Sequence, residues 1–163
     1  MIYLALDNAL VTTGWSIFQN DKLLKYNKFT IPANKSIDKR LGLYWKELTD
    51  LYYQFDFSHL FFEDCQNQGN AQTYHKLSMV KGSILLWCYF NEIPYTISSP
   101  SHWRSILSNK YNIKFGKSRT EQKNKAKELI RQLYNIEPTE DECDAICIGL
   151  AGIIENEKPK SAF

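Results

Sequence analysis

Apolar residues in the first part of the chain gather in short runs that have the length of β-strands. Residues 2–7 (IYLALD) are apolar up to Asp7, which ends the run. Residues 15–19 and 22–31 form two further runs separated by a turn at Asn20, which is the pattern of a β-hairpin. The chain is therefore expected to begin with three strands joined by hairpins.

Helical periodicity begins after Pro32 and then alternates with strand-like runs. Apolar residues at steps of three and four between Leu41 and Phe55 predict a helix with Ser36 as its cap. Thr139 and Glu142 have the T-x-x-E spacing of a capping box, which predicts a last helix from about Thr139. Between these helices the pattern predicts a strand at 58–64, a helix at 70–91, a strand at 94–99, a short helical turn at 100–107, a polar loop at 108–118 and a helix at 119–134.

This order of elements predicts an α/β fold built on one mixed sheet. Strands linked by hairpins pair antiparallel, and strands separated by helices pair in parallel. We therefore expect five strands, three antiparallel and the others parallel, flanked by helices. No repeat or Pro/Gly-rich linker divides the sequence, so a single domain is expected over residues 1–156, with a short C-terminal tail at 157–163.

The composition is that of a globular protein, with 163 residues of which 44% are hydrophobic and 23% charged. The longest apolar stretch, residues 84–90, is too short to span a membrane, and the N-terminus lacks the features of a signal peptide. A cytoplasmic location without a membrane partner is therefore expected. The four cysteines show no CxxC spacing, which favours buried, reduced thiols over a zinc site.

Positive charge is concentrated in one part of the chain, although the net charge is only +2. Residues 104–131 contain nine Lys or Arg against two acids, and the remaining residues carry a net charge of −5. A basic stretch beside acidic residues is typical of proteins that handle phosphodiesters. A solvated basic helix face would explain the same stretch.

Four acids are predicted to meet at one edge of the sheet. Asp7 ends the first strand and Glu63 ends the fourth, and parallel neighbours present their carboxyl ends at the same edge. Asp141 and Asp144 are three residues apart at the start of the last helix, so they share one face. Clustered carboxylates of this kind suit Mg²⁺ or Mn²⁺. For Asp141 and Asp144 the alternative is an acidic first turn favoured by the helix dipole.

Five stretches, in this order and at these separations, resemble the RuvC-type Holliday junction resolvases of the ribonuclease H-like superfamily. They are LALDNALVTTGW, LFFEDCQ, ISSPSHWRSIL, KNKAKELI and DECDAICIGLAG. The similarity extends from about Ile2 to Gly152. In its compactness and in its departures from the family pattern, the sequence resembles phage-encoded members. It implies a homodimer that cleaves four-way DNA junctions with Mg²⁺, for which Mn²⁺ is expected to substitute.

The resemblance also implies roles for individual residues. Asp7, Glu63, Asp141 and Asp144 take the positions of the metal-binding carboxylates, and these four with Lys123, near the scissile phosphate, are the predicted catalytic residues. Two metal ions held in this way activate water without a nucleophilic side chain. The expected DNA contacts are Arg104, Lys117, Arg119, Lys125, Gln66 and Asn67. Arg104 stands where the family commonly has lysine, and we interpret it as a phosphate clamp because Arg is not a proton donor.

The sequence departs from the family pattern in two turns. Asn8 and Ala9 stand where many members have Pro-Gly, and the loop after Glu63 has no aromatic residue before Tyr74, where some members place a wedge that opens the junction. The helix at 70–91 is apolar over more than one stripe, which fits either a homodimer face or a helix buried inside the domain.

Two other functions remain possible from the sequence. A different ribonuclease H-like nuclease would act on RNA–DNA hybrids, flaps or forks, and the fold alone does not separate it from a resolvase. A non-catalytic, dimeric DNA-binding protein would be favoured by the loss of one acid, but all four acids are present.

Overall fold

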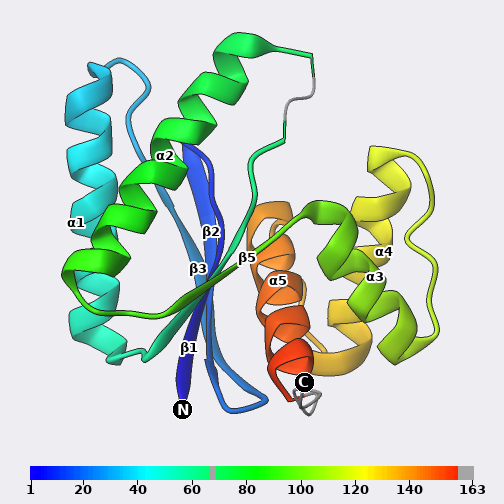
Figure 1. Ribbon diagram of the computed structural model, residues 1–163. Coiled ribbons are helices and arrows are strands. Elements are labelled where there is room, and N and C mark those ends of the chain that lie inside the picture. Colours follow the sequence, from blue (N-terminus) through cyan, green and yellow to red (C-terminus); the bar gives the residue numbers. More distant parts are fainter. Residues whose placement is uncertain (67–68, 158–163) are drawn as a thin grey trace, which may run out of the picture.

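A computed structural model describes residues 1–66 and 69–157, which form a sheet covered by helices on both faces (Figure 1). The elements in chain order are β1 (Ile2–Asp7), β2 (Thr12–Gln19), β3 (Lys22–Thr30), α1 (Ile37–Phe55), β4 (His59–Glu63), α2 (Ala71–Phe90), β5 (Tyr95–Ser98), α3 (Pro100–Tyr111), α4 (Arg119–Tyr134) and α5 (Glu140–Asn156).

The strands form one five-stranded mixed sheet in the order β3-β2-β1-β4-β5. β1 and β3 pair antiparallel with β2, β4 pairs in parallel with β1, and β5 pairs in parallel with β4. The hairpin turn contains Asn20 with a positive φ of 53°, a conformation that Asn tolerates better than most residues. The predicted five-stranded mixed sheet, with three antiparallel strands and the others parallel, is confirmed.

Side chains along each strand point alternately to the two faces of the sheet, which divides the core into two layers. Leu4 and Leu6 of β1 face α1 and α2, whereas Ala5 faces the layer that contains α5. Helices α3 and α4 pack outside α5, so α1 and α2 lie on one side of the sheet and the other three helices on the opposite side (Figure 1). The central strands β1 and β4 are thus covered on both faces, which explains their nearly continuous apolar sequences.

The starts of three helices can be compared with the sequence-based predictions. The capping box of Thr139 and Glu142 is present at the start of α5. Ser36 is the N-cap residue of α1, but its side chain makes no capping hydrogen bond. The turn expected at 100–107 is instead the start of the 12-residue helix α3. Trp103, Ile106 and Leu107 bury one side of this helix, which ends at Tyr111 and is followed by Asn112 in the left-handed conformation.

The described residues contain no helix of the length and apolar character that a membrane crossing requires. Of the expected tail, only Glu157 belongs to the described residues. The single domain over residues 1–156 and the cytoplasmic location stay predictions.

Candidate active site

Two of the predicted acids lie side by side at the ends of neighbouring parallel strands. Leu6 pairs with Phe62, and Asp7 and Glu63 follow these residues by one position. The side chain of Asn8 accepts a hydrogen bond of 3.0 Å from the Glu63 N–H and thereby joins the two strand ends. Alternation places both acids on the face that α5 covers, because Ala5 and Phe61 belong to that layer.

The other two acids reach this position because α5 lies very close to β2. Gly14 is the antiparallel partner of Asp7, and a Cβ on Gly14 would lie 1.9 Å from the carbonyl oxygen of Asp141. Only glycine therefore leaves room for the first turn of α5 at this point of the sheet. Farther along, the Ser16 hydroxyl donates a 2.9 Å hydrogen bond to the Ala145 carbonyl, which fixes the helix along the strand.

All four acids line one hollow, together with most of the predicted DNA-binding residues. The hollow has a cavity volume of about 450 Å³ and is also lined by Gln66, Arg104, Lys117, Arg119 and Lys123. A second hollow of about 490 Å³ shares Asp7, Glu63 and Asp141 and extends to Asn70 and Tyr74 at the start of α2. The two form one groove across the strand ends, with the carboxylates at its centre.

Burial and the repulsion of neighbouring charges oppose the ionisation of Asp7, Glu63 and Asp144. Burial, and then the charges of Asp144, Glu63 and Asp141, hold the pKa of Asp7 well above its usual range. Burial raises the pKa of Glu63 to about 7, against a hydrogen bond from Trp103 that lowers it. Burial raises the pKa of Asp144 to about 6, against the positive charges of Arg104 and Lys123. Cations in the groove would stabilise the ionised acids.

The donor set fits a hard divalent cation, because it consists of carboxylate oxygens alone. Within residues 1–66 and 69–157, however, no three His, Cys, Asp or Glu side chains are arranged to hold one ion together. Side-chain rotation would therefore have to accompany metal binding at these four acids.

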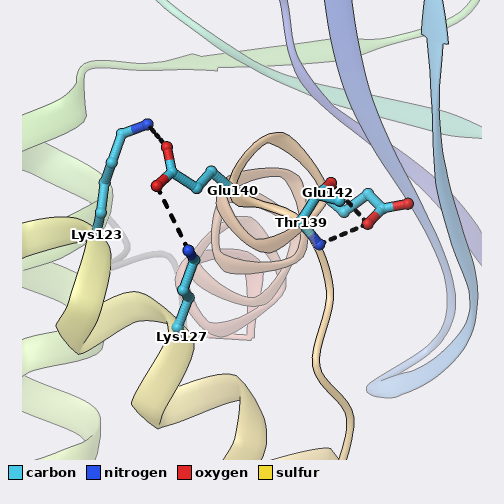
Figure 2. Close-up of polar contacts among 5 residues, drawn as sticks. All are labelled: Lys123, Lys127, Thr139, Glu140 and Glu142. Carbon is cyan, nitrogen blue, oxygen red and sulfur yellow. Dashed lines mark hydrogen bonds and ion pairs between the residues drawn. The ribbon is translucent and has the colours of Figure 1, made fainter.

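The predicted basic residues fall into two groups. Lys123 contacts Glu140, which also pairs with Lys127 at 3.4 Å (Figure 2). Lys125 contacts Glu128 at 2.5 Å and lines neither hollow. Arg104, Lys117, Arg119 and Lys123 thus share the groove with the acids, and Lys125 does not.

The loop after Glu63 contributes Asp64 and Gln66 to the lining of the groove. Asn67 lies outside the described residues, whereas Gln66 lines both hollows. Asp64 lines the second hollow, but its carboxylate accepts a 2.6 Å hydrogen bond from Lys81 of α2. This ion pair compensates the charge of Asp64, which therefore differs from the four acids at the centre of the groove.

Sequence reasoning did not identify three residues that shape the site. Asn8 joins the strand ends, Gly14 admits α5, and the Trp103 indole N–H donates a 2.7 Å hydrogen bond to Glu63. A glycine inside a β-strand does signal a close approach of another backbone. Trp103 gave no such signal, because its position in α3 has the pattern of an ordinary core residue.

Comparisons with known proteins agree with this architecture. No protein-family model matches the chain, and no curated protein matches it in sequence. Thermus thermophilus RuvC, solved in complex with a Holliday junction substrate, is 12% identical with a TM-score of 0.75, and 96% of this chain and 95% of that chain are covered. Fowlpox virus resolvase, in complex with Holliday junction DNA, is 14% identical with a TM-score of 0.64 over 97% and 100% of the two chains. The yeast mitochondrial Holliday junction resolvase Ydc2 is 10% identical with a TM-score of 0.66 over 93% and 78%.

At identities of 10–14% these similarities concern the fold. They extend over almost the whole chain, as the resemblance of the sequence motifs does. The protein therefore has the ribonuclease H-like fold of the RuvC-type Holliday junction resolvases.

Proposed function

We propose that the protein is a metal-dependent endonuclease that cuts four-way DNA junctions and other branched DNA. The observation that carries this proposal is the groove in which four carboxylates are flanked by basic side chains. It is supported by the fold, which is shared with two proteins solved in complexes with Holliday junction DNA. Among functions of ribonuclease H-like folds, junction cleavage accounts for the groove and the structural similarity together.

The metal ligands in this proposal are Asp7, Glu63, Asp141 and Asp144, which would hold Mg²⁺ or Mn²⁺. Four partly buried carboxylates repel one another and thereby destabilise the folded chain. A cation bound among them would reduce this repulsion and stabilise the fold. When bound, such ions supply the activation of the attacking water and the neutralisation of charge on the leaving oxygen.

The basic residues of the groove are proposed to hold the DNA backbone. Arg104 lies close enough to Glu63 and Asp144 to lower the pKa of both, so a phosphate bound to its guanidinium would lie next to the carboxylates. Lys117 and Arg119 lie exposed at the start of α4 and extend the positive surface outward. Lys123 is placed to contact a phosphate once its pairing with Glu140 is exchanged.

The protein is proposed to act as a homodimer, because two symmetric cuts in a junction require two sites related by a two-fold axis. Apolar side chains are exposed where α2 ends and β5 begins: Leu86, Tyr89, Phe90 and Tyr95 are 55%, 77%, 70% and 45% exposed. We call these four residues the α2–β5 surface. The opposite side of α2 buries Val80, Ile84 and Trp87, so this helix has apolar side chains both inside the fold and on its outer face.

The proposal can be tested by comparing substrates. A labelled four-way junction is incubated with the protein beside a matched duplex, a fork, a flap and an RNA–DNA hybrid, with Mg²⁺, Mn²⁺ or EDTA. Cutting of the junction in preference to the others, abolished by EDTA, supports the proposal. Preferred cutting of forks or hybrids would retain the chemistry but contradict the substrate. Tight junction binding without cutting in either metal would instead indicate a non-catalytic binding protein.

A further inference from the structure

Trp103 contacts the site through the edge of its ring. It is fully buried in α3, and its indole N–H donates a 2.7 Å hydrogen bond to Oε2 of Glu63. A hydrogen bond to an ionised carboxylate is shorter and stronger than one between neutral groups. The bond fixes the orientation of the carboxylate and leaves the other oxygen of Glu63 for the groove.

The same residue contacts the site through the face of its ring. The guanidinium carbon of Arg104 lies 4.5 Å from the centroid of the Trp103 ring, a cation–π arrangement. Among the described residues, the buried Nε of Arg104 has no hydrogen-bond partner, so the ring face is the contact that orients this side chain. Phe115 packs edge-on against Trp103, with 5.7 Å between the ring centroids, and holds the Trp103 ring in place.

We propose that Trp103 is a positioning residue that sets the Glu63 carboxylate and the Arg104 guanidinium at a fixed place relative to each other. This inference rests on the proposed function, in which Glu63 holds metal and Arg104 holds phosphate. Because both groups contact one buried ring, Trp103 would hold the residue that binds metal and the residue that binds phosphate in a fixed relative position. Groups that position metal ligands in this way are important for metal affinity.

A second buried tryptophan separates this role from ordinary packing. Trp87 is also fully buried, and its indole N–H donates a 3.0 Å hydrogen bond to the hydroxyl of Thr49. It belongs to the core layer under α1 and α2, on the opposite face of the sheet from the acids. Replacing Trp87 with Phe therefore removes the same atoms from a comparable environment without touching the site.

The experiment compares Trp103→Phe, Trp103→Leu and Trp87→Phe in the full chain. Mn²⁺ binding is measured by electron paramagnetic resonance without DNA, and junction binding is measured in EDTA. We expect Trp103→Phe to weaken Mn²⁺ binding by about 10- to 100-fold, because the N–H is lost. Its junction binding should stay within about twofold of wild type, because the phenyl face remains under Arg104. Trp103→Leu should also weaken junction binding, by roughly 3- to 10-fold.

Equal Mn²⁺ affinities of Trp103→Phe and Trp87→Phe, with wild type binding Mn²⁺ normally, would overturn this inference alone. A wild-type protein that binds no Mn²⁺ would overturn it together with the proposed function. If the variants do not fold, a measurement on the wild-type protein still tests the inference. In ¹H–¹⁵N spectra, the indole signal of Trp103 should shift during a Mg²⁺ titration, and the indole signal of Trp87 should not. An unshifted Trp103 signal at saturating Mg²⁺ would also overturn the inference.

Discussion

The ammonium group of Lys123 contacts the carboxylate of Glu140, the residue directly before Asp141 (Figure 2). Lys127, one helical turn after Lys123, approaches the same carboxylate at 3.4 Å. One acid at the start of α5 therefore pairs with a cation that lines the same hollow as the proposed metal ligands. A DNA phosphate that enters the groove must compete with Glu140 for Lys123.

We expect Glu140→Gln to tighten junction binding in EDTA, because Lys123 becomes free and one negative charge beside the groove is removed. The affinity should rise several-fold at low salt, and one added phosphate contact should steepen the slope of log affinity against log salt by up to about 0.9. Both quantities can be measured by fluorescence anisotropy over a series of salt concentrations.

The matched control for this change is Glu128→Gln. Glu128 pairs with Lys125, outside both hollows, and its removal changes the net charge of the protein by the same amount. Equal effects of the two substitutions would mean that only overall charge matters, and the proposed competition at Lys123 would be wrong.

The acids of the groove should make the metal-free protein less stable as pH rises. In the folded chain the pKa values of Glu63 and Asp144 are about 7 and about 6, against ordinary values of 4.5 and 3.8. Between these values the folded state holds protons that the unfolded state has released, so the free energy of unfolding in EDTA falls from about pH 4 to about pH 7. Asp7→Asn removes the most deeply buried of these charges and should raise the free energy of unfolding at pH 8 by about 1 to 3 kcal/mol.

Thermal unfolding in EDTA at pH 5 and pH 8 measures this effect. The gain from Asp7→Asn should be smaller at pH 5, and Mg²⁺ should stabilise wild type at pH 8 more than the variant. Asp50→Asn serves as the control, because Asp50 belongs to an exposed pair with Lys46 and should have little influence. A loss of stability in Asp7→Asn at pH 8 would contradict the electrostatic account.

Gly14→Ala should disturb the approach of α5 to the sheet. Its Cβ would lie 1.9 Å from the Asp141 carbonyl oxygen, so the first turn of α5 has to move. We expect a loss of about 1 to 3 kcal/mol in the free energy of unfolding and weaker Mn²⁺ binding in the folded fraction. Denaturant unfolding and Mn²⁺ titration measure the two effects.

Gly42→Ala is the control, because nothing lies within 4 Å of an added Cβ at this position of α1. It should stabilise the protein by about 0.5 to 1 kcal/mol, since alanine is the better helix former. A Gly14→Ala protein with unchanged stability and metal binding would show that this close contact is not needed.

Strand ends and helix starts were enough to predict where the four acids meet. Asp7 and Glu63 close two apolar runs, and the parallel pairing of such strands follows from the helix between them. The hydrogen bond from Trp103 to Glu63 could not be predicted, because the two residues are 40 positions apart in the sequence and Trp103 is surrounded by apolar residues. Lys125 lies away from the groove because of its position in the turn of α4. Lys123 and Lys127 are four residues apart and share a face of this helix, whereas Lys125 lies on another face and pairs with Glu128. Its contact with DNA stays a prediction.

The α2–β5 surface should hold two copies of the chain together. Phe90→Asp introduces a charge on this surface and should shift the protein from dimer to monomer. Light scattering after size-exclusion chromatography measures the mass in solution. Leu133→Asp, on α4 in the opposite layer, replaces another exposed apolar residue and should leave the mass unchanged. A monomeric wild type, or a dimeric Phe90→Asp protein, would contradict this assignment.

The most direct test of the central claim is the cleavage of a four-way junction by wild type and by Asp7→Asn, with Mg²⁺ or with EDTA. Strands labelled one at a time show on a sequencing gel where each cut falls. The account predicts paired cuts, placed symmetrically across the junction, that disappear both with EDTA and with Asp7→Asn while junction binding persists. Cutting that survives in EDTA or in a folded Asp7→Asn protein would contradict the claim that these carboxylates hold the catalytic metal.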